Sequence, residues 1–434
     1  MMRLTLSENK RHFSLDGKPF FWLGDTAWLL LEKLTFEEAL VYLDNRAAKG
    51  FNVIQMTLVH KNHYTNRYGS PALIDDDFAR PNPDTTPDAF WSLARRVVDA
   101  AAQRGIFMAL LPSWGNFVSG GALAGDKIDV YTDFLAGHFA DCENVLWLVG
   151  GDERGSAAPE DYKRIGNCLR AKCPGHLIGY HPFGRCSSSQ WFHEEEWLDF
   201  NMFQSGHRRY DQLRLNQWDD KVDAETFVGE DNFKYVQHDR ALTPAKPVLD
   251  GEPSYELIPQ GLHDPSQPYW QACDVRRYAY WSLMAGACGF TYGSNSIMQF
   301  WRGVEKGAYG VKEVWQEALH HHGSMHVTHA RALMESIDWQ SGVPAQDYLV
   351  DNDGEKYDYN LALRTSRALC VYTYTGKPLS VNTALLPEGV TGWWFDPVSG
   401  GKSCFGPVER MEKLTLTPPD RLCGQNDWVL MFTW

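Results

Sequence analysis

The chain lacks any long uninterrupted apolar run. No stretch of its 434 residues approaches the ~18 apolar residues that a membrane-spanning helix requires. The opening segment, MMRLTLSENKRHFSLDGKPF, has neither the apolar core nor the small-residue cleavage site of a signal peptide. The 9 cysteines are scattered without CxxC pairs, a usage typical of reduced thiols. We therefore expect a cytoplasmic protein with no membrane partner.

Positive charge is also scarce. Lys and Arg total 41 against 55 Asp and Glu, which gives a formal net charge of -14, and no basic run stands out. Nucleic acids and anionic membranes are therefore poor candidate partners. No G-x-G-x-x-G follows the first predicted strand, which argues against a dinucleotide cofactor. No G-x-S-x-G is present either, which argues against a serine hydrolase.

Apolar and aromatic residues are abundant instead. A hydrophobic content of 44% with 22% charged residues predicts a sizeable core, and the length predicts two or three domains or one barrel with a small partner. The 17 Trp and 19 Tyr exceed what a core needs. Aromatic faces stack on sugar rings as well as on each other, so this excess favours a carbohydrate ligand and a large core about equally.

Eight apolar segments alternate, for the most part, with amphipathic helices. The helix signals include a capping box formed by Thr35 and Glu38, and Thr86 with Pro87, which together predict the start of another helix. Each strand is too apolar to face water on either side. The pattern predicts a (β/α)8 TIM barrel of the α/β class rather than an open doubly wound sheet. The predicted strands are 20–24, 52–58, 106–112, 145–150, 177–180, 199–203, 247–250 and 289–292.

The pattern changes near residue 340. Beyond it, apolar and polar residues alternate and turn signals recur about every 8–12 residues, which is typical of antiparallel sheets. We expect an N-terminal strand and hairpin extension at 1–19, with Asp16-Gly17 as its turn. A barrel at 20–339 and a small all-β sandwich at 340–434 follow.

Two carboxylates follow predicted barrel strands. Asp152 ends the run NVLWLVGGD after the fourth strand, and Glu252 follows the seventh strand in KPVLDGEP. Functional side chains of such barrels lie just past the carboxyl ends of the strands, and these two strands lie on opposite sides of a closed barrel. The carboxylates can therefore face each other across a bound sugar. Glycoside hydrolysis needs such a pair, so we predict Asp152 and Glu252 as catalytic residues.

Other strand ends carry side chains that suit a sugar, since they can hydrogen-bond hydroxyl groups or stack on a ring. Three alternatives stay open. Asp25 could instead cap a helix. His181 and His207 could hold site residues in place without touching the substrate. Glu153 or Glu230 could take the place of either catalytic carboxylate. The predicted substrate-binding residues are Asp25, Trp28, His60, Trp114, His181, Gln204, Tyr255 and Tyr292.

The histidine-rich run HHHGSMHVTH, residues 320–329, resembles a metal-binding helix in one respect. His322 and His326 stand four residues apart, as metal ligands on a helix do. No acidic third ligand follows at a recognisable offset, and Gly323 is expected to interrupt the helix. We expect no metal and no cofactor, because carboxyl groups can carry both proton transfers.

Six segments, in order along nearly the whole chain, resemble the apiosidase-like (β/α)8 glycoside hydrolases, glycoside hydrolase family 140. They are FFWLGDTAW, GFNVIQMTLV, NVLWLVGGDE, FQSGH, KPVLDGEPSYE and ACGFTYGS. The later WWFDPVSGG resembles the small β-sandwich of these proteins, which often carries a collagen-binding label. The resemblance implies an exo-acting glycosidase that removes terminal β-D-apiose, a furanosyl sugar, from plant-derived glycosides or oligosaccharides. It also implies that Asp152 is the acid/base and Glu252 the nucleophile.

Two rival functions remain. One is a glycosidase for another sugar, such as an arabinofuranoside, and the other is a non-catalytic carbohydrate-binding protein on a barrel scaffold.

A retaining double displacement places the two carboxyl groups ~5–5.5 Å apart, whereas inversion places them ~6.5–9.5 Å apart. The C-terminal domain could bind carbohydrate through Trp393 and Trp394 or brace the barrel. The sequence does not indicate an oligomeric state.

Overall fold

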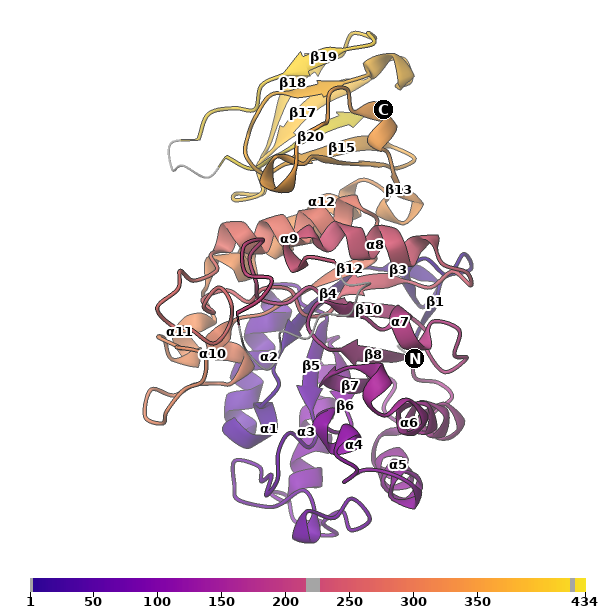
Figure 1. The fold of residues 1–434 in the computed structure, drawn as a ribbon, viewed down its shortest axis with the longest axis vertical. Helices are drawn as coiled ribbons and strands as arrows, with labels where there is room; N and C mark the ends of the chain where they lie inside the picture. Colours follow the sequence, from indigo (N-terminus) through magenta and orange to yellow (C-terminus); the bar gives the residue numbers. More distant parts are fainter. Residues whose placement is uncertain (1–2, 216–226, 422–425) are drawn as a thin grey trace.

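Figure 1 shows a barrel with a smaller all-β domain above it, in a computed structural model that describes residues 3–215, 227–421 and 426–434. The chain begins with a three-stranded antiparallel sheet of β1 (Leu4–Leu6), β2 (Phe13–Leu15) and β3 (Lys18–Phe20). Asp16 and Gly17 join β2 to β3 with φ of 50° and 77°. Both values are left-handed, as a tight two-residue hairpin turn requires, so the predicted turn is confirmed.

The barrel sheet of the described chain has eight parallel strands. Neighbours pair from β8 back to β4 and then through β12 and β11 to β10, while the short β9 (Cys186–Ser187) pairs antiparallel with β10. The Asp199 N–H donates to the Ile178 carbonyl across the remaining gap, at 2.8 Å, so the barrel is nearly closed. The predicted TIM barrel is confirmed. Its strands are β4 (Trp22–Thr26), β5 (Val53–Thr57), β6 (Phe107–Leu111), β7 (Val145–Glu153), β8 (Ile178–Pro182), β10 (Asn201–Gln204), β11 (Val248–Asp250) and β12 (Gly289–Tyr292).

Helices connect the strands on the outside of the barrel. The Thr35 capping box is confirmed, because its hydroxyl accepts from the Glu38 N–H at 3.3 Å and the Glu38 carboxylate accepts from the Thr35 N–H at 2.9 Å. The longer helices are α2 (Phe36–Ala48), α3 (Phe90–Ala102), α5 (Asp126–Phe139), α6 (Pro159–Lys172), α8 (Asn232–Ala241), α9 (Ala272–Met284) and α12 (His322–Ser336). Single-turn helices are α1 (Leu30–Lys33), α4 (Asn116–Ser119), α7 (Ser189–Phe192), α10 (Asn295–Met298) and α11 (Trp315–Ala318).

Helix α3 starts later than the sequence predicts. Its first residue is Phe90, not the Thr86-Pro87 pair. The Phe90 N–H donates to the hydroxyl of Ser70 at 3.1 Å, so the cap comes from a loop twenty residues away. The start of α3 is therefore set by the tertiary contact with Ser70 and not by the local Thr86-Pro87 pair.

Helix α12 runs through Gly323, so the expected interruption was wrong. The glycine lies in the first turn, where its N–H donates to the Glu256 carboxylate at 3.0 Å. A Cβ at this position would lie 2.4 Å from a Glu256 oxygen, so only glycine allows this approach. Glu256 also accepts from the Tyr292 hydroxyl at 2.7 Å, which fastens the start of α12 to the barrel.

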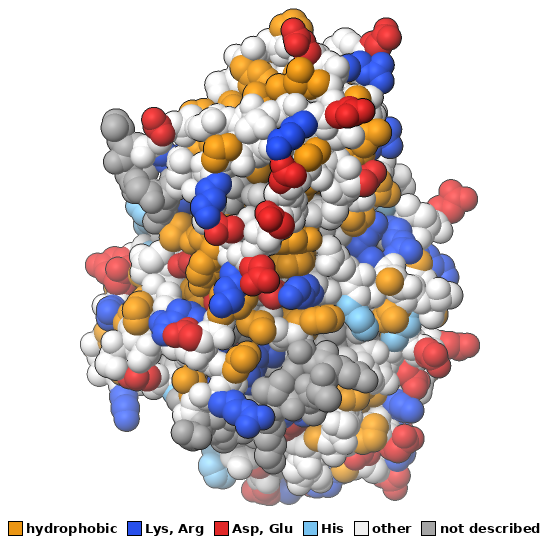
Figure 2. All heavy atoms as spheres, turned by 45° about the horizontal axis from the view of Figure 1, so that its top comes forward, with side chains coloured by type: hydrophobic (Ala, Val, Ile, Leu, Met, Phe, Trp, Pro, Cys, Tyr) orange, Lys and Arg blue, Asp and Glu red, His pale blue; other side chains and the backbone are white. Residues whose placement is uncertain are grey.

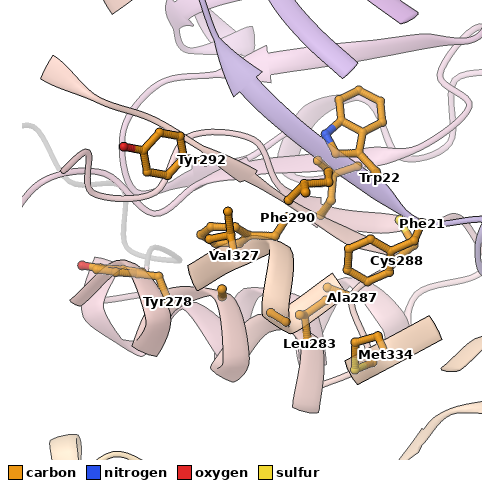
Figure 3. Close-up of a cluster of buried hydrophobic side chains, with 14 of the residues drawn as sticks. Phe21, Trp22, Tyr278, Leu283, Ala287, Cys288, Phe290, Tyr292, Val327 and Met334 are labelled. Atoms are coloured by element: carbon orange, nitrogen blue, oxygen red, sulfur yellow. The ribbon is translucent and has the colours of Figure 1, made fainter. Parts of the chain in front are cut away.

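Apolar side chains fill the space between the barrel and its outer helices. Figure 3 shows Phe290 of β12 and Trp22 of β4 on one side, facing Val327 of α12 and Leu283 of α9. All four are at most 2% exposed, and each such burial contributes roughly 1.5–3 kcal/mol of hydrophobic free energy. This cluster continues through α9 and α12 to the C-terminal domain.

The C-terminal domain is all-β, as predicted. A six-stranded sheet is faced by a two-stranded sheet of β16 (Leu379–Val381) and β19 (Leu414–Leu416), with Leu379 and Val381 in the shared core. The large sheet has the order β13 (Val343–Pro344), β14 (Leu361–Arg364), β15 (Ala368–Thr373), β20 (Trp428–Thr433), β17 (Thr391–Phe395) and β18 (Lys402–Pro407).

The other face of the large sheet packs on helix α9. Tyr280 of the helix stacks on Tyr372 of β15 with ring centroids 4.9 Å apart. Arg276 of the helix donates two hydrogen bonds of 2.8 Å to Asp427, and both side chains are buried. Trp394 is buried, whereas the partly buried Trp393 donates to the Thr433 hydroxyl at 3.0 Å. Adjacent residues of a strand point to opposite faces of the sheet, so the two rings do not form one flat surface on which a sugar could stack. This arrangement favours a C-terminal domain that braces the barrel over one that binds carbohydrate.

The surface in Figure 2 carries acidic and basic side chains scattered over both domains. Among residues 3–215, 227–421 and 426–434, no helix combines the length and apolar character that crossing a bilayer demands.

Candidate active site

A cavity of about 280 Å³ opens at the carboxyl ends of the barrel strands. Both predicted carboxylates, Asp152 and Glu252, line it. Five of the eight predicted substrate-binding residues line it too, namely Trp28, His60, Trp114, Gln204 and Tyr255. Residues from strands 1, 2, 3, 4, 6 and 7 of the barrel thus converge on one space, as their strand-end positions predict.

Asp152 is aimed by an irregular strand end. The pairing of β7 with β8 shifts between Gly150 and Glu153, and Asp152 has a left-handed φ of 50°. Gly150 and Gly151 precede it with φ of 92° and 116°, and a Cβ on Gly150 would lie 2.5 Å from the His181 carbonyl oxygen. The two glycines therefore permit a bulge that turns the Asp152 side chain into the cavity.

Glu252 is held by a network on the opposite wall. The Gln55 amide donates to the Gly251 carbonyl at 2.8 Å, and the Gly206 N–H donates to the Glu252 carbonyl at 3.1 Å. Behind them, the Ser205 hydroxyl donates to the buried Asp250 carboxylate at 2.6 Å. The backbone on both sides of Glu252 is thereby fixed before any ligand arrives.

Two histidines lie against the Glu252 carboxylate. His181 Nε2 is 3.1 Å from one carboxylate oxygen, and His207 Nε2 is 3.2 Å from the other. The backbone N–H of Asp152 points to His181 Nδ1 at 3.5 Å, and that of Tyr255 points to His207 Nδ1 at 3.4 Å. An Nδ1 that accepts a hydrogen bond leaves the proton on Nε2. Both rings therefore carry their proton on Nε2. His207 donates a hydrogen bond to Glu252, whereas His181 Nε2 contacts the other carboxylate oxygen without hydrogen-bond geometry.

The two carboxyl groups are driven to opposite protonation states. Burial and the negative charge of Glu252 raise the pKa of Asp152 to about 7. Burial alone would raise the pKa of Glu252, but the contacts with His181 and His207 outweigh it and lower that pKa to about 2. Near pH 5 one group is a proton donor and the other an anion.

Asp152, His181 and Glu252 could also be considered as a metal site. One potential ligand atom of each lies within 4.8 Å of the others. A histidine whose Nδ1 accepts the Asp152 amide must give up its Nε2 proton to bind a metal through Nε2, which would make it an anionic imidazolate. The hydrogen bonding therefore fits a proton-carrying His181 better than a metal ligand.

Aromatic rings form one wall of the cavity. Trp28 packs edge-on against Trp114 with centroids 5.5 Å apart, and His60 lies 4.7 Å from Trp114. The Trp28 indole N–H donates to the Tyr255 hydroxyl at 2.9 Å. Burial lowers the pKa of His60 to about 4, so this ring is neutral at physiological pH. The wall offers apolar ring faces and few charges, which suits the flat face of a sugar.

Three predicted substrate-binding residues lie outside the cavity lining. Tyr292 is buried and donates to Glu256, so it supports helix α12. His181 is fully buried and touches Glu252 rather than the cavity. Asp25 is fully buried as well, and its carboxylate accepts from Tyr42 at 2.7 Å and from Arg46 at 2.5 Å. Their burial does not favour direct contact with a sugar, because strand-end position alone does not reveal what lies behind the strand.

Replacing Asp25 by Asn should reduce stability and leave substrate affinity unchanged. The change leaves the buried Arg46 charge without its partner, which typically costs about 3–5 kcal/mol. Chemical denaturation measures the loss, and KM measured on the folded variant is the control. A raised KM with unchanged stability would instead restore Asp25 as a ligand of the substrate.

A loop that the strand pattern did not reveal completes the cavity. Residues 298–309, after the last barrel strand, supply the lining residues Met298, Gln299, Trp301, Glu305, Lys306, Ala308 and Tyr309. The aromatic and glycine content of SIMQFWRGVEKGAYG was the available signal. His207 was named only as a supporting residue, and it both lines the cavity and contacts Glu252.

The two spare carboxylates lie apart from this chemistry. Glu230 is buried and paired with Arg277 at 3.1 Å, and it accepts from the Tyr357 hydroxyl at 2.6 Å. Glu153 is not part of the cavity lining, and it accepts from the Ser119 hydroxyl at 2.9 Å. Neither competes with Asp152 or Glu252.

Comparison with known proteins gives consistent matches. A family model described as "Apiosidase-like, catalytic domain" matches residues 7–341, and one described as "Putative collagen-binding domain of a collagenase" matches residues 343–433. A solved structure named glycoside hydrolase is 36% identical, with 100% of this chain and 97% of the other covered and a TM-score of 0.92. A glycoside hydrolase family 5 structure from Bacteroides vulgatus is 35% identical, with 99% and 93% covered and a TM-score of 0.93. No curated protein matches.

Proposed function

The chain belongs to the apiosidase-like family of TIM-barrel glycoside hydrolases, and we propose that it removes a terminal β-D-apiosyl residue from plant-derived glycosides. The observation that carries this proposal is the pair of carboxyl groups, Asp152 and Glu252, with opposite pKa shifts in one small cavity. An acid that keeps its proton beside a carboxylate that has lost its own is what acid-assisted glycoside cleavage needs.

The mechanism that we propose is a double displacement. Glu252 attacks the anomeric carbon while Asp152 gives its proton to the leaving oxygen, which breaks the glycosidic bond and forms a glycosyl ester. Asp152, now ionised, takes a proton from water, and the resulting nucleophile cleaves the ester and frees Glu252. One oxygen of Asp152 lies within 4.8 Å of one oxygen of Glu252, which supports retention, because an inverting pair of carboxyl groups is held ~6.5–9.5 Å apart.

The cavity supports an exo mode of action. Its volume of about 280 Å³ and its boundary of Trp28, Trp301 and Tyr309 suit one terminal sugar better than the interior of a polymer. Gln204 and His60 are placed to hydrogen-bond hydroxyl groups, while Trp114 offers a ring face.

The proposal is tested by incubating the protein with matched aryl glycosides. We expect release of apiose from an aryl β-D-apiofuranoside at a far higher kcat/KM than release from an α-L-arabinofuranoside. Proton NMR of the first-formed sugar should show the β anomer, as retention requires. EDTA should leave the rate unchanged. Preference for the arabinofuranoside would show that the substrate sugar is arabinose and not apiose. Binding without release of any pentose would indicate a non-catalytic protein.

Activity should fall as the pH rises through about 7. The pKa of Asp152 is raised to about 7, so above that pH the group loses the proton that the leaving oxygen requires. On the acid side, Glu252 stays ionised down to about pH 2, so activity should persist at pH 4. A pH profile of kcat/KM measures both limbs.

The variant His207→Gln serves as a control for the acid limb. It removes the hydrogen-bond donor to one Glu252 oxygen, so the acid limb should move to higher pH. The basic limb should move less, because His207 is the last of the causes that act on the pKa of Asp152. An acid limb that does not move would show that His207 plays no part in ionising Glu252.

A further inference from the structure

A second cavity, of about 450 Å³, lies at the other end of the barrel. It is lined by Ala245 and Ala287, which stand just before strands β11 and β12, whereas the active site follows the strand ends. The N-terminal segment supplies Arg11 and His12, and Leu363 of β14 closes the cavity from the C-terminal domain. Three parts of the chain therefore meet around one space.

The apolar side of this cavity continues the cluster in Figure 3. Leu283, Ala287 and Met334 group at one end of that cluster, and all three line the cavity. Trp339 adds an indole ring that packs edge-on against His12, with centroids 5.4 Å apart. These walls are well packed, since each of the four apolar side chains is at most 7% exposed.

The polar side carries two arginines and no acid. Arg11 donates to the Arg240 carbonyl at 2.6 Å, and Arg240 donates to the Gly286 carbonyl at 2.8 Å. Both of these contacts are with backbone carbonyls, and no Asp or Glu of the described residues lines the cavity. Burial and the nearby positive charge of Arg11 lower the pKa of Arg240.

A guanidinium has five N–H groups, and the carbonyl contacts use few of them. His12 adds a further polar atom, because its Nδ1 is buried without a partner in the described chain while its side chain lines the same cavity. Asn9, Gln340 and Ser341 complete the polar rim. Two partly buried cations around a pre-formed cavity that has spare donors and no acid in its lining match what a bound oxyanion requires.

We propose that this cavity binds a small organic oxyanion, through a phosphoryl or carboxylate group held between Arg11 and Arg240. The apolar wall of Leu283, Met334 and Trp339 takes the carbon skeleton of the ligand. Because the cavity joins the N-terminal segment, the barrel and the C-terminal domain, the bound anion stabilises their junction and leaves turnover at the far end unaffected.

The test is thermal unfolding of the full chain with inorganic phosphate or with malonate, each against sodium chloride at equal ionic strength. We expect a saturable rise of Tm by several degrees with at least one of the two, since a ligand that binds only the folded state stabilises it. The stronger of the two responses identifies the phosphoryl or the carboxylate chemistry. Arg11→Gln should abolish the saturable rise and keep kcat/KM.

Controls separate this site from general charge effects. Arg410→Gln removes an exposed charge of the C-terminal domain and should keep the response. Arg240→Gln should also abolish it, and the basal Tm of each variant shows whether it folds. No saturable rise in the unmodified protein, or a rise that persists in folded Arg11→Gln, would overturn the proposal.

Discussion

Glu252→Gln should reduce kcat by at least about 10⁴-fold, because the amide cannot form the glycosyl ester on which double displacement depends. The fold should survive, since glutamine has the same shape and its carbonyl oxygen can still accept from His207. Steady-state kinetics on an aryl β-D-apiofuranoside give the loss, and circular dichroism reports on the fold.

A smaller side chain at the same position identifies the role. In Glu252→Ala, added azide should restore release of the aryl group and yield a glycosyl azide of inverted configuration, since the anion replaces the missing nucleophile. Glu153→Gln is the matched control, because Glu153 follows Asp152 directly in the chain but does not line the cavity, and it should keep near-normal kcat. Near-normal turnover by Glu252→Gln would refute the assignment.

Asp152→Asn should have an effect that depends on the leaving group. Without the proton from Asp152, an unactivated alcohol leaves as an alkoxide, so kcat/KM should fall by about 10²–10⁴-fold. Activated nitrophenyl glycosides need little protonation, so glycosyl-enzyme formation should fall much less on them. A series of aryl glycosides with graded leaving-group pKa values measures the difference in slope.

The same variant also reports on the pH profile. The amide side chain that replaces the carboxyl group does not titrate, so the basic limb near pH 7 should disappear from whatever activity remains. A loss that is equal across all leaving groups, with the basic limb intact, would contradict the acid/base role. Another group in the cavity would then have to be the proton donor.

Much of the fold followed from local patterns. Every barrel strand was predicted within a few residues. A short apolar run between two amphipathic helices is typical of a buried parallel strand and of few other elements. Asp152 and Glu252 came together because the topology of a closed barrel places the ends of its fourth and seventh strands around one cavity. These predictions needed only the order of elements.

The failures concern contacts between distant segments. Asp25 has the same strand-end position as the other site residues, and the packing of Tyr42 and Arg46 beneath it explains its burial. The start of α3 depends on Ser70, and the continuity of α12 depends on Glu256. The loop at 298–309 has no strand or long helix of its own, so periodicity gave no reason to place it over the cavity.

His181 contacts both proposed catalytic residues through a single ring. Its Nδ1 meets the backbone of Asp152, and its Nε2 meets the carboxylate of Glu252. An imidazole is rigid and of fixed width, so it acts as a spacer between the wall that carries the acid and the wall that carries the nucleophile. The approach of the Asp152 backbone to the Glu252 carboxylate is therefore limited by the width of an aromatic ring.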